Sequence, residues 1–105
     1  MTTALFVHPA ANREADVARS WYDDIATDLG NDFAQAVAEA IDLILQNPRL
    51  FADIGDGIHR AFVRRFPYQV FYCFANCQIR VLAVHHSHAD RQAVLDRARR
   101  RDTQQ

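Results

Sequence analysis

Three hydrophobic runs in the second half of the chain predict three consecutive strands. They cover Ala61-Phe62-Val63, residues 70–74 and residues 79–84, and they are rich in the β-branched and aromatic residues that strands favour. Phe66-Pro67-Tyr68 is expected to form the first turn, because proline cannot donate to a central ladder. Ala75-Asn76-Cys77-Gln78 is expected to form the second, since Asn76 tolerates a positive φ. Connections this short predict an antiparallel meander.

Apolar residues at helical spacing predict two helices before the meander. The first helix is expected to have its stripe widened by Trp21 and to end at Gly30-Asn31, and the second to end at Asn47-Pro48. Glu14 and Asp16 are expected to interact with the positive end of the first helix dipole. The short link predicts an antiparallel helical hairpin that covers one face of the sheet. The stripes comprise Ala11, Ala15, Ala18, Tyr22, Ile25 and Leu29 in the first helix, and Phe33, Val37, Ala40, Ile41 and Ile44 in the second.

The remaining segments complete an α+β fold. Residues 3–8 form a short apolar run, ended by Pro9, that predicts a first strand, and residues 47–57 are expected to form a loop. Ser87-His88-Ala89-Asp90 resembles a helix-start box, with Asp in place of the usual Glu or Gln. A short amphipathic helix is expected to follow it. We therefore expect a single domain over residues 1–105, with an N-terminal strand, a helical hairpin packed on an antiparallel sheet, and a short C-terminal helix.

Composition indicates a soluble globular protein, and we expect no cofactor. Hydrophobic residues make up 50% and charged residues 24%. No apolar run approaches the ~20 residues of a membrane helix, and the N-terminus lacks the pattern of a signal peptide, so we expect a cytoplasmic protein that does not bind membranes. Cys73 and Cys77 are expected to be reduced thiols, since an extended strand holds them too far apart for a disulfide. Their spacing predicts no metal site.

The charges are divided unevenly along the chain. Residues 1–56 carry three arginines against ten acidic residues, a net charge of −7. Residues 57–105 carry nine arginines against three aspartates, a net charge of +6, and the chain has no lysine. Arginine suits bidentate contacts with carboxylates and phosphates. The basic half is therefore expected to bind a nucleic acid or an acidic protein segment.

Short motifs, taken in order, resemble the RelE/ParE superfamily of bacterial type II toxins, and especially its ParE-like, plasmid-stabilisation branch. The resemblance extends over residues 5–97. The motifs are His8-Pro9-Ala10, Trp21-Tyr22, Asn47-Pro48, Gly57 with Arg60, Arg65-Phe66-Pro67-Tyr68 with Tyr72, Ile79, and Leu82-Ala83-Val84 leading to His86.

The resemblance implies a toxin that a cognate antitoxin wraps and neutralises in a hetero-oligomer. ParE-like toxins bind and poison DNA gyrase without a catalytic site of their own, whereas RelE-like toxins cut mRNA on the ribosome. Of the four positions that are basic in the nuclease branch, Arg60 fits, but Phe62, Gln69 and Ser87 depart. We therefore expect gyrase as the target and no catalytic residues. The expected target or antitoxin contacts are Arg60, Arg64, Arg65, Arg80, Arg97, Arg99, Arg100 and Arg101.

Two alternatives stay open. Strand alternation predicts Arg80, His86 and His88 on one face of the sheet and His85 on the other, and the first three residues are the candidate catalytic groups of a ribosome-dependent mRNA endonuclease. His86 could equally be a structural partner at the sheet edge, and a metal site at His86 and His88 is not expected because no carboxylate completes it. The second alternative is a decayed toxin that only binds its antitoxin and contributes to repression of their operon.

Overall fold

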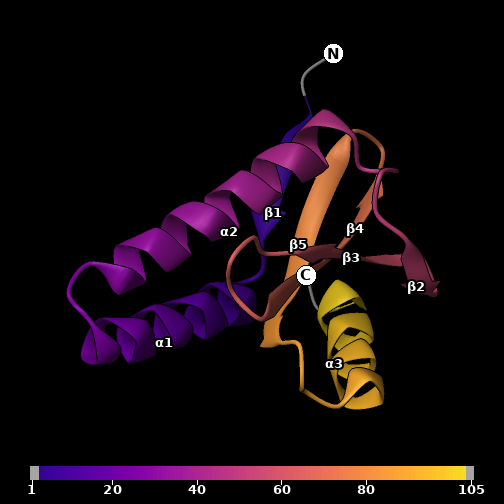
Figure 1. Cartoon of the computed structure of the whole chain (residues 1–105). Coiled ribbons are helices and arrows are strands. Elements are labelled where there is room, and N and C mark those ends of the chain that lie inside the picture. Colours follow the sequence, from indigo (N-terminus) through magenta and orange to yellow (C-terminus); the bar gives the residue numbers. More distant parts are fainter. Residues whose placement is uncertain (1–2, 104–105) are drawn as a thin grey trace.

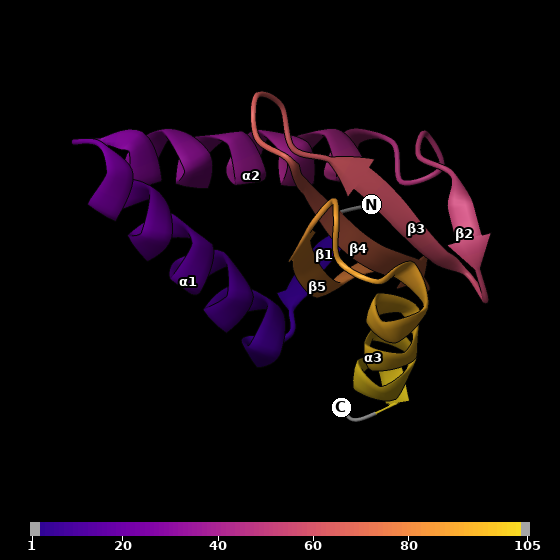
Figure 2. The ribbon, with the colours of Figure 1, turned by 60° about the horizontal axis from the view of Figure 1, so that its bottom comes forward.

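A mixed five-stranded sheet lies between a helical hairpin and a C-terminal helix (Figures 1 and 2). The computed structural model describes residues 3–103. The strand order is β1-β5-β4-β3-β2. In chain order the elements are β1 (Ala4–Val7), α1 (Pro9–Ile25), α2 (Leu29–Gln46), β2 (Asp53–Gly55), β3 (Ile58–Phe62), β4 (Tyr68–Ala75), β5 (Gln78–His86) and α3 (Arg91–Thr103).

The predicted meander of β3, β4 and β5 is confirmed, and both connections are antiparallel. In the β4–β5 turn Asn76 and Cys77 have φ values of 52° and 60°, the left-handed pair of a type I′ hairpin turn. In the β3–β4 connection the positive φ, 73°, falls on Arg65, one residue before the predicted turn. The predicted tip is therefore right for the second turn and one residue late for the first.

Two strands of the sheet differ from the sequence-based expectation. β1 pairs parallel with β5, from Ala4 beside Gln78 to Val7 beside Val81, so the sheet is mixed rather than purely antiparallel. A parallel pair of strands requires a long crossover connection, and α1, α2 and strands β2 to β4 lie between β1 and β5 in the chain. β2 lies inside the predicted loop and pairs with β3 at its edge.

The helical hairpin forms as predicted, but its turn is earlier. α1 ends at Ile25, and Asp28, with φ of 66°, makes the reversal, so Gly30 and Asn31 lie inside α2. The first helix begins at Pro9, and the His8 Nδ1 atom accepts a hydrogen bond from the Ala10 N–H at 3.0 Å. A histidine therefore caps the helix that the proline starts.

Gly30 is required by the close crossing of the two helices. A Cβ atom at this position would lie 2.3 Å from Asp23 Oδ1 and 2.6 Å from the Arg19 carbonyl oxygen. The Gly30 N–H donates to Asp23 Oδ1 at 2.8 Å. The prediction that Gly30 ends the first helix is therefore wrong. Gly30 lies inside α2, where the lack of a side chain allows α1 to approach closely.

The core has two parts on opposite faces of the sheet. The larger cluster packs the hairpin on one face, here called the hairpin face, and includes fully buried Phe33, Ile44 and Tyr72. The smaller packs α3 on the other, here called the α3 face, around Phe71 and Leu82. Each large apolar side chain buried here stabilises the fold by about 1.5–3 kcal/mol.

The first helical stripe is only partly buried. Ala11, Ala18 and Tyr22 are buried as predicted, and Tyr22 packs on Phe33 and on Phe66 of the β3–β4 turn. Ile25 is exposed, and Trp21 does not widen the buried stripe, because the outer end of the hairpin extends beyond the sheet (Figure 1).

The C-terminal helix starts later and runs longer than expected. Asp90 is its cap, since Asp90 Oδ1 accepts hydrogen bonds from the Gln92 and Ala93 N–H groups. Ser87 lies in the turn before the helix, where its N–H donates to the Pro67 carbonyl oxygen at 2.7 Å. None of the helices within residues 3–103 has the length and apolar character needed to cross a membrane.

Replacing Gly30 by alanine should destabilise the protein by about 1–3 kcal/mol through overpacking. Elsewhere in a helix interior the same change adds about 0.5–1 kcal/mol of stability, so the expected effect has the opposite sign. Urea unfolding of Gly30→Ala, compared with the exposed Ala38→Gly in the same helix, measures it. A stabilised Gly30→Ala variant would contradict the close crossing.

Candidate functional site

A β-bulge in β5 decides which side chains share a face of the sheet. Phe71 pairs with Ala83 and the next residue, Tyr72, pairs with Val81, so Leu82 is the extra residue. Leu82 and Ala83 consequently both point into the cluster under α3. From Val84 onward, the alternation of β5 is reversed relative to the first half of the strand.

The bulge overturns the predicted grouping of Arg80 with His86. Arg80 lies on the α3 face, where its guanidinium pairs with Asp102 at 2.8 Å. His86 lies on the hairpin face, with its ring 5.3 Å from that of Tyr68. His85 is the histidine that shares the α3 face with Arg80. Strict alternation of side chains along β5 predicted the wrong face, because the bulge adds one residue that has no partner in β4.

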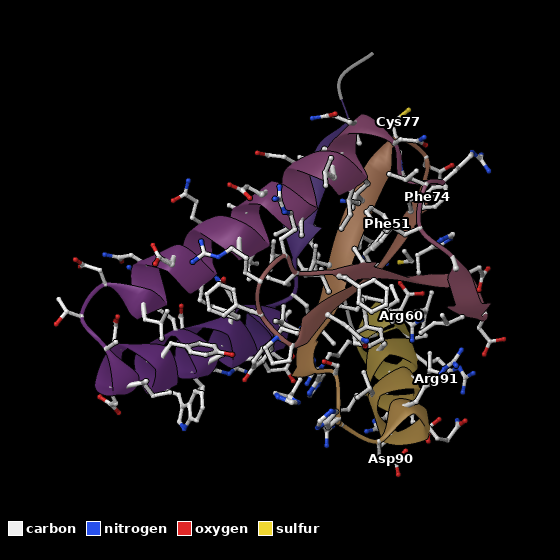
Figure 3. The ribbon with its side chains drawn as sticks, viewed as in Figure 1. Phe51, Arg60, Phe74, Cys77, Asp90 and Arg91 are labelled. Atoms are coloured by element: carbon white, nitrogen blue, oxygen red, sulfur yellow. The ribbon has the colours of Figure 1, made fainter. Side chains whose placement is uncertain are left out.

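One row of side chains crosses the α3 face at the end of the meander. Phe62 pairs with Gln69, and Gln69 pairs with His85. Arg60 extends beside this row, with its guanidinium carbon 5.0 Å from the centre of the Phe62 ring. Figure 3 shows Arg60 on β3 and Arg91 in the first turn of α3. We call Arg60, Phe62, Gln69 and His85 the meander row.

Glu14 joins α1, β5 and α3 at one point. Its Oε1 and Oε2 atoms accept from Arg101 in bidentate geometry at 2.9 and 3.0 Å, and Oε1 accepts from the Val84 N–H at 3.1 Å. Oε2 lies 2.9 Å from His85 Nε2. Burial alone raises the pKa of Glu14, but the hydrogen bonds from His85, Arg101 and Val84 outweigh burial and lower this pKa to about 2.

The same group of residues closes an open part of the sheet edge. β1 ends beside Val81, so the β1 side of β5 has no strand beyond that point in the described sheet. There the Leu82 carbonyl oxygen accepts from Arg101 at 2.9 Å, and the Val84 N–H donates to Glu14. The Glu14–Arg101 pair therefore bonds the backbone groups that a longer β1 would have bonded.

His85 is held in this cluster through its Nε2 atom. Its Nε2 atom is 2.9 Å from Glu14 and 3.3 Å from Arg97 Nη1. One nitrogen cannot donate to the carboxylate and accept from the guanidinium at once. The shorter contact, to an anion, places the proton on Nε2, so Arg97 is a neighbouring cation and not a hydrogen-bond donor to His85.

The candidate arginines divide into paired and unpaired groups. Arg80 pairs with Asp102, Arg101 with Glu14, and Arg99 with Asp96 and with Asp56, the latter at 2.5 Å without hydrogen-bond alignment. The other five form no ion pair within the described part of the chain. These are Arg60, Arg64, Arg65, Arg97 and Arg100.

The two cysteines are both free thiols, as predicted. Burial, together with a hydrogen bond to the Asp102 carboxylate, raises the pKa of Cys73 to about 12. Cys73 is consequently unreactive at neutral pH. Cys77 is exposed at the tip of the β4–β5 hairpin (Figure 3).

The predicted histidine pair lies at the mouth of a cleft on the hairpin side. His86 Nδ1 accepts from the His88 N–H at 3.1 Å, and the two rings are 5.0 Å apart. The cleft, of about 590 Å³, lies between α1 and the end of β5, and the Glu14 cluster also borders it. Its charged and aromatic lining residues are Arg13, Glu14, Tyr68, His85, His86 and Arg101. Within the described residues, no three His, Cys, Asp or Glu side chains are grouped so as to hold a metal ion.

The order and packing of these elements define the fold shared by RelE and ParE toxins, and the predicted resemblance is confirmed at this level. The chain is similar to a chain of the chromosomal ParDE toxin–antitoxin system of P. aeruginosa, with a TM-score of 0.71, 16% identity, and coverage of 81% of this chain and 96% of the other. It is also similar to a double arginine-to-alanine mutant of the E. coli toxin RelE in the free state. There the TM-score is 0.60, with 16% identity and coverage of 96% and 98%. No family model and no curated protein matches the sequence.

The predicted interaction of Glu14 and Asp16 with the helix dipole is wrong, because α1 starts at Pro9 and neither residue lies in its first turn. The sequence carries a different signal for Glu14. Glu14 lies three residues after Ala11 and four before Ala18, so helical spacing puts its carboxylate beside the buried stripe. A carboxylate in that position needs a cationic partner. The partner, Arg101, is 87 residues away, and only the folded chain reveals it.

Acid should destabilise the protein through Glu14. The folded pKa of about 2 lies below the ordinary glutamate value of 4.5, so the unfolded chain binds the proton more readily. The stability that this carboxylate contributes, up to about 3 kcal/mol, is therefore present above pH 4.5 and lost as the pH falls toward 2. Urea unfolding of the wild type, Glu14→Gln and the exposed Glu39→Gln between pH 7 and pH 3 measures the difference. Wild type and Glu39→Gln should lose stability more steeply than Glu14→Gln, and three parallel profiles would contradict the assignment.

Proposed function

We propose that the protein is the toxin of a type II toxin–antitoxin system, acting in the cytoplasm and neutralised by a cognate antitoxin. We further propose that it inhibits growth by binding DNA gyrase and not by cleaving mRNA. The shared fold supports the first proposal. It does not choose the target, because related toxins with different targets share this fold.

The observation that carries the choice of gyrase is the meander row. Cleavage of RNA through its 2′-hydroxyl needs a base, cations around the phosphate and an acid for the leaving oxygen. Phe62 and Gln69 supply none of these, and the Nε2 proton of His85 is directed to Glu14. Ser87, at the fourth position, lies in the turn after β5. Arg60 is the remaining cation of the row, which is suited to contact but not to proton transfer.

The unpaired arginines support binding of an acidic partner. Arg64 and Arg65 are exposed on the β3–β4 turn, Arg60 lies on the neighbouring strand, and Arg97 and Arg100 are exposed on α3. Guanidinium groups that form no internal ion pair can pair with carboxylates or phosphates of a partner at little desolvation cost. We assign target or antitoxin binding to these five, and a structural role to the ion-paired Arg80, Arg99 and Arg101.

The nuclease alternative would have to use the cleft beside α1. His86 and Tyr68 line this cleft and His88 contacts His86, but Arg80 lies on the α3 face, paired with Asp102. A ribosome-dependent nuclease would have to use these histidines without the arginine assigned to it. The decayed-toxin alternative requires neither catalytic nor target-binding residues on either face of the sheet.

Expression of the chain alone should arrest growth with DNA breaks and induction of the SOS response. His86→Ala should retain this effect, while Arg60→Ala combined with Arg64→Ala and Arg65→Ala should weaken it at least about tenfold by removing contacts worth more than about 1.4 kcal/mol. Arg19→Ala is the matched control, since it removes an arginine from the acidic half. Inhibition of purified gyrase measures the same series in vitro.

Two results would overturn the proposal. Cleavage of mRNA on purified ribosomes, abolished in His86→Ala, would establish the nuclease alternative. Normal growth on expression of a soluble, folded chain would establish the decayed toxin.

A further inference from the structure

An exposed apolar stripe runs along α1 on the side away from the core. Val17, Trp21 and Ile25 have exposed fractions of 71%, 57% and 56%. They are spaced by four residues and therefore form one ridge of the helix. No described segment of the chain covers this ridge. A tryptophan between two aliphatic side chains is the composition of an interface centre and not of an ordinary solvated face.

The charges at the ends of the stripe have opposite signs. Arg13 lies one turn before Val17, at the N-terminal end. Asp24 and Asp28 lie at the C-terminal end, beside and just after Ile25. All three are exposed, and none forms an ion pair with another described residue. The ridge itself is basic at one end, apolar in the middle and acidic at the other end, with the exposed Asp16 beside Val17 on the neighbouring ridge.

Such a surface is its own complement when it is turned by 180°. A two-fold axis through Trp21 would place Val17 of one copy against Ile25 of the other, and the two indole rings against each other. It would also bring Arg13 of each copy to the acidic end of the other. This is the self-complementary arrangement that a two-fold dimer requires.

We propose that this stripe is a homodimer interface, in which α1 of one copy packs antiparallel against α1 of a second copy. The occupant is a second copy because the apolar spacing and both charge signs match in that orientation. The outer end of the hairpin extends beyond the sheet, so a second molecule can reach α1 there (Figures 1 and 2). Arg60 and Phe62 of the meander row lie on β3, away from α1, whereas His85 borders the cleft beside Arg13 and Val17.

The dimer should be weak and concentration-dependent. Stable interfaces bury about 800 Å² on each partner, and one short helix with three apolar side chains offers less. A dissociation constant in the micromolar range is therefore expected. This inference does not rest on the proposed target, because a monomeric chain can still be toxic and a non-toxic chain can still dimerise.

Sedimentation of the full chain across the micromolar range tests the proposal. The wild type should change from monomer to dimer with rising concentration. Trp21→Ser should raise the dissociation constant at least about tenfold. Leu50→Ser is the matched control, because Leu50 is 60% exposed but lies outside the stripe. Circular dichroism and urea unfolding establish that each variant is folded.

Charge reversal gives a second measurement that does not depend on apolar contacts. Arg13→Asp should weaken the dimer by placing like charges together, and Arg13→Asp combined with Asp24→Arg and Asp28→Arg should restore it. Trp21 is the only tryptophan of the chain, so its fluorescence should shift to longer wavelength on dilution.

Three outcomes would overturn the proposal. They are a wild type that is monomeric throughout the range, a dimer unaffected by Trp21→Ser, and a charge-reversed triple variant that fails to dimerise although it is folded. A monomeric wild type whose antitoxin binding is lost in Trp21→Ser would assign the stripe to the antitoxin instead.

Discussion

The bidentate pair between Glu14 and Arg101 is the contact on which the arrangement of the layers depends. It ties the first helix to the last and bonds two backbone groups of β5 where β1 ends. A pair of charges this far from water stabilises a fold only when its remaining hydrogen bonds are made. Here they are made by Val84, Leu82 and His85, which explains how a partly buried carboxylate keeps a pKa near 2.

The β-bulge in β5 gives the two faces of the sheet different chemistry. The bulge at Leu82 turns His85 toward the α3 face, where Glu14 holds its proton, and turns His86 toward the hairpin face. The strand thus separates Arg80 from His86 and His88, which a regular ladder would have placed on one face with it.

Arginine has two separate uses in this chain. Three arginines tie α3 to the rest of the fold, around a small apolar cluster, through the ion pairs Arg80–Asp102, Arg99–Asp56 and Arg101–Glu14. The unpaired arginines lie on the β3–β4 turn, on β3 and on the outer side of α3, where solvent and partners reach them. Part of the positive charge in the basic half of the sequence therefore has a structural role. The net charge of this half overstates the positive charge that is available to a partner.

Local patterns in the sequence determined the meander, the type I′ turn at Asn76 and Cys77, the second helix up to Asn47 and the fold class, because each depends on neighbours within a few residues. The resemblance to RelE/ParE toxins rested on the same short motifs. Only the tertiary structure decided the parallel pairing of β1, the place of Gly30 in a helix crossing, the exposure of Trp21 and the partners of Glu14. Part of the meander row could be predicted from the sequence. Regular alternation places Arg60, Phe62 and Gln69 on one face, whereas the face of His85 depends on the bulge in β5. The features that only the tertiary structure decided depend on contacts between residues far apart in the chain, or on one residue without a partner in a strand ladder. Local periodicity in the sequence contains no information on either.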